Sequence, residues 1–221
     1  MTRSKFVLPR SFYTRGTLAV ARELLGKHLA RRIKGRELVG RIVEVEAYDG
    51  RDDPASHAYR GVTTKNRLMF GKGGFAYVYF TYGKHYCFNV TTEKEGVPGA
   101  VLIRALEPVR GIEMMQKNRE RKRFRDLTNG PGKLTQAVSI TKEQNGFNLT
   151  RSRELFICKP RVKEDFEVVS ARRVGIRVGV EKPWRFYIKN DRFVSRRQRE
   201  VGDVDDDHHR DMQSSVGCGD D

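Results

Sequence analysis

Alternation of apolar and polar residues predicts β-strands along much of the chain. The strongest patterns cover residues 36–48, 75–81, 86–92 and 100–106, which are rich in β-branched and aromatic residues. Shorter strand-like segments cover residues 166–170, 173–180 and 184–188. Side chains two residues apart in a strand point to the same side of the sheet. The first strand is therefore expected to place Ile42, Glu44, Glu46 and Tyr48 on one face.

Apolar residues spaced by three and four positions predict helices between these strands. One such stripe runs over residues 18–29, with Thr17 near its start. A second helix is expected from Pro108 to about residue 125, because proline suits the first turn of a helix. A third, short helix is expected at residues 133–140, after a break at 129–132.

Two connections are distinctive. Residues 50–74 are polar and contain several glycines, which predicts a long loop, and loops of that length are commonly functional or disordered. Residues 82–85 form the tip of a hairpin between two strong strands. The whole pattern predicts an α+β fold: a single mixed domain with a curved, mainly antiparallel β-sheet, flanking helices and a protruding β-hairpin.

Charge is distributed unevenly along the 221 residues, which carry 44 Lys and Arg against 28 Asp and Glu. Residues 201–221 hold seven Asp against one Arg and contain no aromatic residue. We therefore expect a basic domain at residues 1–200 and an acidic, disordered tail at 201–221. A body with this charge favours binding to phosphate backbones. A membrane surface is the weaker alternative, because no basic amphipathic helix stands out.

Cysteine usage and the N-terminal residues point to an intracellular protein. Three cysteines, at 87, 158 and 218, show neither a paired framework nor a Cys-x-x-Cys spacing, so no disulfide scaffold and no metal site is expected. The first residues lack an apolar signal segment, and no apolar run approaches the length of a membrane span. A phosphate-binding loop and a Gly-x-Ser-x-Gly turn are also absent from the sequence.

Acidic residues beside a polyanion need an explanation, because they repel phosphate. Glu44 and Glu46 make more sense as chemistry than as binding contacts, although an arbitrary Glu-x-Glu pair is more often a solvated strand edge. Arg104 lies in an apolar strand and needs a partner if it is buried. Glu44 and Glu46 are the natural candidates, and an ordinary core ion pair is the alternative.

Several aromatic and polar residues allow two interpretations. Tyr82 at the hairpin tip is either a wedge between base pairs or packed on a neighbouring loop. Tyr77 and Tyr79 form either a stacking pocket for a planar base or part of the core. Asn89 either reads a base edge or serves the structure, and a lone loop histidine such as His57 is usually unremarkable.

The order of these motifs resembles one known family. The matching residues are Val-Glu-Ala-Tyr at 45–48, His57, and the segments 65–70, 77–83, 87–89, 101–108, 130–134, 171–175 and 183–187. In this order they resemble the alkyladenine (3-methyladenine) DNA glycosylase family of the mammalian type, over about residues 8–197. The resemblance implies a monofunctional enzyme that needs no cofactor and acts on double-stranded DNA containing damaged purines, and we expect a monomer.

The resemblance also implies residue roles. Glu46 would be the general base that activates water, and Arg104 would hold that water and the nearby phosphodiester. Tyr48 and Tyr79 would stack on the flipped base, and His57 would help to enclose it. The other implied residues are Asn89, which would disfavour the 2-amino group of guanine, Val174, which would supply backbone contacts, and Tyr82, which would fill the gap in the duplex.

The chain also departs from the mammalian pattern. Lys84 and His85 replace less polar residues at the hairpin tip, and we expect Lys84 and Arg67 to contact the DNA backbone. A non-catalytic DNA-binding module with a glycosylase-like fold is the main alternative, and an RNA-binding protein is a second. The sequence does not rank the lesions that this family excises.

Overall fold

The computed structural model describes residues 6–81, 83–120, 122–162 and 164–195. Its strands are β1 (His28–Ile33), β2 (Arg36–Asp49), β3 (Ala76–Thr81), β4 (His85–Thr91), β5 (Gly99–Arg110), β6 (Leu155–Cys158), β7 (Val168–Ala171) and β8 (Arg185–Ile188). The helices are α1 (Arg10–Tyr13), α2 (Thr17–Leu24), α3 (Ile112–Asn118) and α4 (Pro131–Ala137). Short 3-10 turns are η1 (Arg67–Phe70), η2 (Phe124–Asp126) and η3 (Lys142–Gln144).

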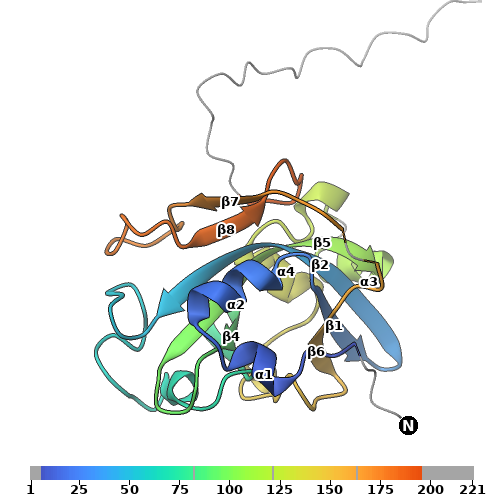
Figure 1. Ribbon diagram of the computed structural model, residues 1–221. Helices are drawn as coiled ribbons and strands as arrows, with labels where there is room; N and C mark the ends of the chain where they lie inside the picture. Colours follow the sequence, from blue (N-terminus) through green and yellow to red (C-terminus); the bar gives the residue numbers. More distant parts are fainter. Residues whose placement is uncertain (1–5, 82, 121, 163, 196–221) are drawn as a thin grey trace, which may run out of the picture.

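One curved antiparallel sheet organises the domain, with strand order β3-β4-β5-β2-β1-β6. The hairpin of β7 and β8 joins it through β8 and lies over β2 in Figure 1. Helices α2 and α4 contribute Val20, Leu24 and Leu134 to a core shared with β2 and β5. The predicted α+β fold with a curved antiparallel sheet is confirmed.

The long strand β2 is central because it has neighbours along both edges. Its first half pairs with β1, its residues 44–46 pair with β8, and β5 follows it along the opposite edge. Glu44 and Glu46 are therefore flanked by strands on both sides and are fully buried. The pairing with β5 shifts register between Ile42 and Glu44 and again between Glu44 and Val45. Ile42 packs in the hydrophobic core.

Two predicted helices are wrong in their extent. The stripe over residues 18–29 continues past α2, but the helix ends at Leu24 and β1 begins at His28. Gly26 lies between them with φ +73°, a left-handed conformation that glycine adopts readily. Pro108 lies in β5 opposite Gly40, beside a register shift, where a missing backbone donor is tolerated.

Other differences lie in the second half of the chain. The helix expected to reach residue 125 ends at Asn118, and Glu120 follows with φ +54°. Residues 173–180 form bends and turns where a strand was expected, and the short strand β6 was missed. Strand β6 is only four residues long, too short for its pattern to predict a strand, and it is held in place by pairing with the distant β1. Residues 201–221, the expected acidic tail, lie outside the described residues.

Candidate active site

A cavity of about 370 Å³ opens where the ends of β2, β3, β4 and β5 meet the segment that precedes β8. Its lining consists of Tyr48, Ala55, His57, Met69, Tyr77, Tyr79, Thr81, His85, Cys87, Asn89, Ala100, Leu102, Arg104, Pro131, Val174, Gly175 and Ile176. Such a volume lies at the lower end of the range for small-molecule sites. Five of the residues predicted to bind the substrate, and Arg104, therefore border one space.

Glu46 lies behind this lining and is fully buried. Its Oε1 accepts a hydrogen bond from the backbone N–H of Val174 at 2.7 Å and lies 3.2 Å from Nη1 of Arg104. Its Oε2 accepts from the hydroxyl of Tyr48 at 2.8 Å. All three of these neighbours border the cavity. These contacts fix the orientation of the Glu46 carboxyl group.

Arg104 lies between two buried carboxylates. Its Nε donates to Oε1 of Glu44 at 3.0 Å, and its Nη2 donates to the hydroxyl of Ser195 at 3.3 Å. Burial alone lowers the pKa of Arg104, but Glu46 and Glu44 together raise it above its ordinary value. The guanidinium therefore stays charged, and the expectation that it pairs with Glu44 or Glu46 is confirmed for both.

Glu44 is the structural partner in this network. Besides Arg104, its Oε1 accepts from Nε of Arg185 at 2.7 Å and from the Ser195 hydroxyl at 2.9 Å, while its Oε2 accepts from the Ser195 backbone N–H at 2.6 Å. Arg185 and Ser195 were not anticipated from the sequence. Both come from the end of the described chain, and nothing in the local pattern marks them.

Aromatic rings form one wall of the cavity. The ring centroids of His57 and Tyr79 are 4.6 Å apart, and those of Tyr77 and Tyr79 are 5.4 Å apart. Nδ1 of His57 shares a hydrogen bond of 2.9 Å with the hydroxyl of Tyr77. Burial lowers the pKa of His57 and raises the pKa of Tyr77 to about 12. This wall is therefore uncharged near neutral pH.

Asn89 is fixed in the middle of the sheet. It lies in β4, opposite Tyr77 in β3 and Leu102 in β5, and is almost fully buried. Its Nδ2 donates to the backbone carbonyl of Tyr77 at 3.1 Å. The amide therefore borders the cavity in a defined position.

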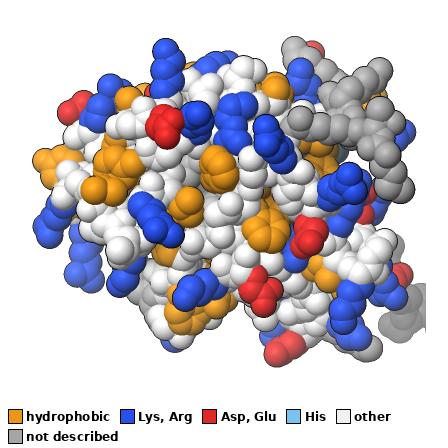
Figure 2. All heavy atoms as spheres, turned by 90° about the horizontal axis from the view of Figure 1, so that it is seen from below, with side chains coloured by type: hydrophobic (Ala, Val, Ile, Leu, Met, Phe, Trp, Pro, Cys, Tyr) orange, Lys and Arg blue, Asp and Glu red, His pale blue; other side chains and the backbone are white. Residues whose placement is uncertain are grey.

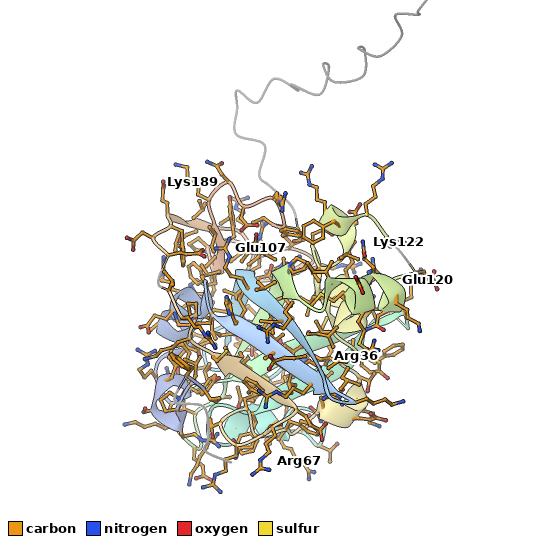
Figure 3. All side chains as sticks on the ribbon, turned by 90° about the vertical axis from the view of Figure 1, so that its right-hand side faces the viewer. Arg36, Arg67, Glu107, Glu120, Lys122 and Lys189 are labelled. Carbon is orange, nitrogen blue, oxygen red and sulfur yellow. The ribbon has the colours of Figure 1, made fainter. Side chains whose placement is uncertain are left out.

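Lys84 and Arg67 are not among the residues that line the cavity. Lys84 and Arg67 are exposed, and Arg67 projects from the lower edge of the molecule in Figure 3. Figure 2 shows Lys and Arg side chains spread over the face seen from below, with acidic side chains interspersed among them. Tyr82 lies outside the described residues.

Two residues that sequence reasoning did not select lie directly behind the site. Arg173 and Asp53 form an ion pair whose side chains are both fully buried. Asp53 is one of two consecutive aspartates in a polar loop, and Arg173 is one of two consecutive arginines, so the sequence alone does not distinguish either from a surface charge.

No metal-binding arrangement and no membrane span is found in the described part of the chain. Among those residues, no three His, Cys, Asp or Glu side chains are placed to hold a metal ion. Nor is any helix there both long enough and apolar enough to cross a bilayer.

An aromatic cavity backed by a buried, donor-held carboxylate, in a protein of net charge +16, is the kind of site expected of an enzyme that acts on nucleic-acid bases. Comparison with known families agrees. The methylpurine-DNA glycosylase family matches residues 11–192, and the chain belongs to this family. It is a DNA glycosylase, and its substrate is DNA.

Curated relatives cover almost the whole domain. A protein of Carboxydothermus hydrogenoformans is 50% identical over 191 residues, which span 86% of this chain and 100% of the relative. A protein of Methanocella arvoryzae is 48% identical over 86% of this chain and 96% of its own length. A protein of Desulfitobacterium hafniense is 48% identical over 85% of this chain and 98% of its own length. All three are named, provisionally, as 3-methyladenine DNA glycosylases.

Proposed function

We propose that this enzyme flips damaged purines out of duplex DNA and hydrolyses their N-glycosidic bond with an activated water, leaving an abasic site. The substrates proposed are 3-methyladenine, 7-methylguanine, hypoxanthine and ethenoadenine. The observation that carries the proposal is the position of Glu46, fully buried directly behind an aromatic cavity and held there by two hydrogen-bond donors and the guanidinium of Arg104.

In this proposal Glu46 is the general base. The donors around its carboxylate fix its orientation, so that it can accept a proton from water attacking C1′ of the sugar. Arg104 and the Val174 backbone would hold that water, and Arg104 would also face the phosphodiester. A glycosylase that cleaves the strand uses an amine nucleophile. Among the described residues, no lysine lines the cavity, which favours water as the nucleophile and an intact strand.

The aromatic side chains would bind the extruded base. Tyr48 and Tyr79 are proposed to stack on it, at roughly 1–3 kcal/mol per contact, with His57 completing the enclosure. A cationic base such as 7-methylguanine gains additionally from electron-rich rings. Asn89, held by the carbonyl of Tyr77, is proposed to exclude the 2-amino group of guanine.

Residues outside the cavity are proposed to contact the DNA duplex. Flipping a nucleotide costs a few kcal/mol and is least costly where pairing is already weakened, which gives a first layer of selectivity. We propose that Tyr82 fills the gap left in the duplex, and that the exposed Lys84 and Arg67 contact the phosphates.

The test is base release from duplexes carrying one hypoxanthine or one ethenoadenine, followed by alkaline cleavage of the abasic sites. Wild-type protein is expected to release the base, and Glu46→Gln is expected to lose about 10²-fold or more of the rate. Glu37→Gln, a change at an ion pair remote from the cavity, serves as the matched control.

The alternatives give different results. Full activity in Glu46→Gln would remove the proposed general base. If wild type releases neither lesion, the same assay on methylated DNA separates an enzyme narrowed to alkylated purines from a protein that binds DNA without releasing any base.

A further inference from the structure

The buried pair of Arg173 and Asp53 lies immediately behind the cavity. Nη2 of Arg173 donates to Oδ1 of Asp53 at 2.7 Å, and Nη1 makes a second, shorter contact with Oδ2. Two parallel hydrogen bonds of this kind fix both the distance and the orientation of the two groups. Burying two charges has a large desolvation cost, which even this geometry does little more than offset. The pair is therefore expected to add little to the net free energy of unfolding.

Arg173 also reaches the strand that carries the proposed general base. Its Nη1 donates to the backbone carbonyl of Ala47 at 3.0 Å, between Glu46 and Tyr48 in β2. Its guanidinium lies over the Tyr48 ring, 4.8 Å from the centroid. The next residue along the chain is Val174, whose N–H donates to Glu46 at 2.7 Å. The Arg173 side chain thus contacts the Tyr48 ring, and its backbone is bonded directly to Val174. Tyr48 and Val174 are the two residues that donate hydrogen bonds to Glu46.

Asp53 connects the ion pair to the loop that carries Ala55 and His57. Its Oδ1 accepts from the backbone N–H of Ala55 at 3.2 Å, and its carbonyl accepts from Ser56 at 2.9 Å. These bonds shape the turn that leads to His57, and Ala55 and His57 both border the cavity. Figure 1 shows the connection between β7 and β8 on the same side of the molecule as the loop that follows β2.

The backbone of Gly179 makes a further contact with the ion pair. Nη2 of Arg173 donates to its carbonyl at 3.2 Å. A Cβ at this position would lie 3.0 Å from Oδ1 of Asp53 and 3.1 Å from Nη2 of Arg173, and φ is +62°. Glycine therefore allows the chain to approach the ion pair closely.

We propose that Arg173 and Asp53 are positioning residues for base release: together they hold Tyr48, the His57 turn and the Val174 N–H in register around Glu46. This inference rests on the proposed function. Neither residue is expected to touch the substrate. Their effect should appear in the chemical step, because misplacement of about 1 Å remote from the chemistry can cost about 10²-fold in rate.

The choice of lesion separates positioning from folding. A cationic 7-methylguanine is already a good leaving group, whereas neutral hypoxanthine depends more on the aligned carboxylate and water. Loss of folded protein lowers release of both lesions equally. Loss of alignment lowers hypoxanthine release more than 7-methylguanine release under single-turnover conditions.

The experiment compares Arg173→Lys and Asp53→Asn with the wild type. Lysine keeps the charge but cannot make the paired hydrogen bonds, and asparagine keeps the shape but lacks the charge. Arg31→Lys is the matched control, since the Arg31 side chain is 9% exposed, pairs with Glu154 at 3.1 Å and does not border the cavity. We expect hypoxanthine release to fall by about 10²-fold, with a smaller loss for 7-methylguanine and little change in Arg31→Lys.

A second readout does not depend on catalysis. The Val174 amide should exchange with deuterium faster in Arg173→Lys and Asp53→Asn than in wild type, while the core amide of Val90 stays protected. The proposal would be overturned if the release rates of both lesions fell equally and in proportion to the loss in melting temperature. It would also be overturned if the variants kept the wild-type ratio of the two release rates and the Val174 amide remained protected from exchange. If the wild type releases no base from any of the lesions, the proposed function fails instead, and the Val174 amide would still decide the positioning role.

Discussion

The hydroxyl of Tyr48 donates to Oε2 of Glu46 at 2.8 Å, so the ring proposed to stack on the base is tied to the carboxylate proposed to activate water. Burial and the neighbouring Glu46 raise the pKa of Tyr48 well above its ordinary value. The hydroxyl therefore keeps its proton and remains the donor. Movement of a base stacked on this ring would therefore be coupled to the orientation of Glu46.

Tyr48→Phe tests this coupling. Phenylalanine keeps the stacking surface but removes one donor from a buried carboxylate, which should cost about 1–3 kcal/mol in the free energy of unfolding. Urea denaturation measures this loss, and single-turnover assays should show slower base release with DNA affinity retained. Tyr59→Phe, at a half-exposed ring, is the control and should change neither quantity. Wild-type stability together with wild-type release would contradict the coupling.

Glu44→Gln should destabilise the domain strongly. The amide turns an NH₂ group toward donors from Arg104, Arg185 or Ser195 and leaves the two arginines short of a counter-charge. Breaking a buried ion pair in this way costs about 3–5 kcal/mol, again measured by urea denaturation.

The matched control is Glu167→Gln, because Glu167 is 67% exposed and pairs with Lys189 at the surface. Loss of such a pair should cost less than about 1 kcal/mol. Similar values for the two variants would show that the Glu44 network adds little to stability.

His57 should make stability depend on pH below neutrality. Burial lowers its pKa from the ordinary 6.5, so just below pH 6.5 the folded protein binds fewer protons at this site than the unfolded chain. Its contribution is therefore complete above pH 6.5 and is lost as the pH falls through the folded-state pKa. Unfolding free energies between pH 7.5 and 5 should decrease more in wild type than in His57→Gln.

His28 provides the comparison for this prediction. Burial lowers its pKa as well, but it lies in β1, remote from the aromatic wall. His28→Gln should therefore remove a separate part of the pH dependence, and the two effects should add. An unaltered pH dependence in His57→Gln would show that the ring titrates alike in the folded and unfolded states.

Lys84→Ala should change the salt dependence of DNA binding. If the exposed Lys84 neutralises one phosphate, its loss should reduce the slope of log K against log salt by about 0.9. Lys189→Ala is the control, because Lys189 already pairs with Glu167 at 3.0 Å. An unchanged slope in Lys84→Ala would remove the proposed backbone contact.

Local patterns predicted the strands around the site well, because alternation and β-branched or aromatic residues are properties of each segment itself. They failed where a single residue or a distant partner decides the outcome. Gly26 ends a stripe that otherwise continues as a helix, and Pro108 is accepted in a strand only because it lies beside a register shift. Strand β6 depends on β1, more than 120 residues earlier in the chain.

The grouping of Glu46 with Arg104 and Tyr48 was predictable for a related reason. Glu46, Arg104 and Tyr48 lie on two strands whose patterns are clear, and an arginine in an apolar strand requires a buried acid nearby. Asp53 and Arg173 are separated by 120 residues and lie in irregular segments. Their partnership follows from tertiary structure, and no short pattern in the sequence contains it.

The two buried acids of β2, Glu44 and Glu46, are neutralised by neighbouring arginines. Glu44 has Arg185 at 2.7 Å and Arg104 at 3.0 Å, and Glu46 has Arg104 at 3.2 Å. A duplex approaching through solvent therefore meets a cationic exterior, and the interior carboxylates add little repulsion at distances beyond the screening length. In the proposed function, lesion search along intact DNA would then proceed through weak, salt-sensitive contacts. Only a nucleotide that has left the helix would come close enough to these carboxylates to be affected by their charge.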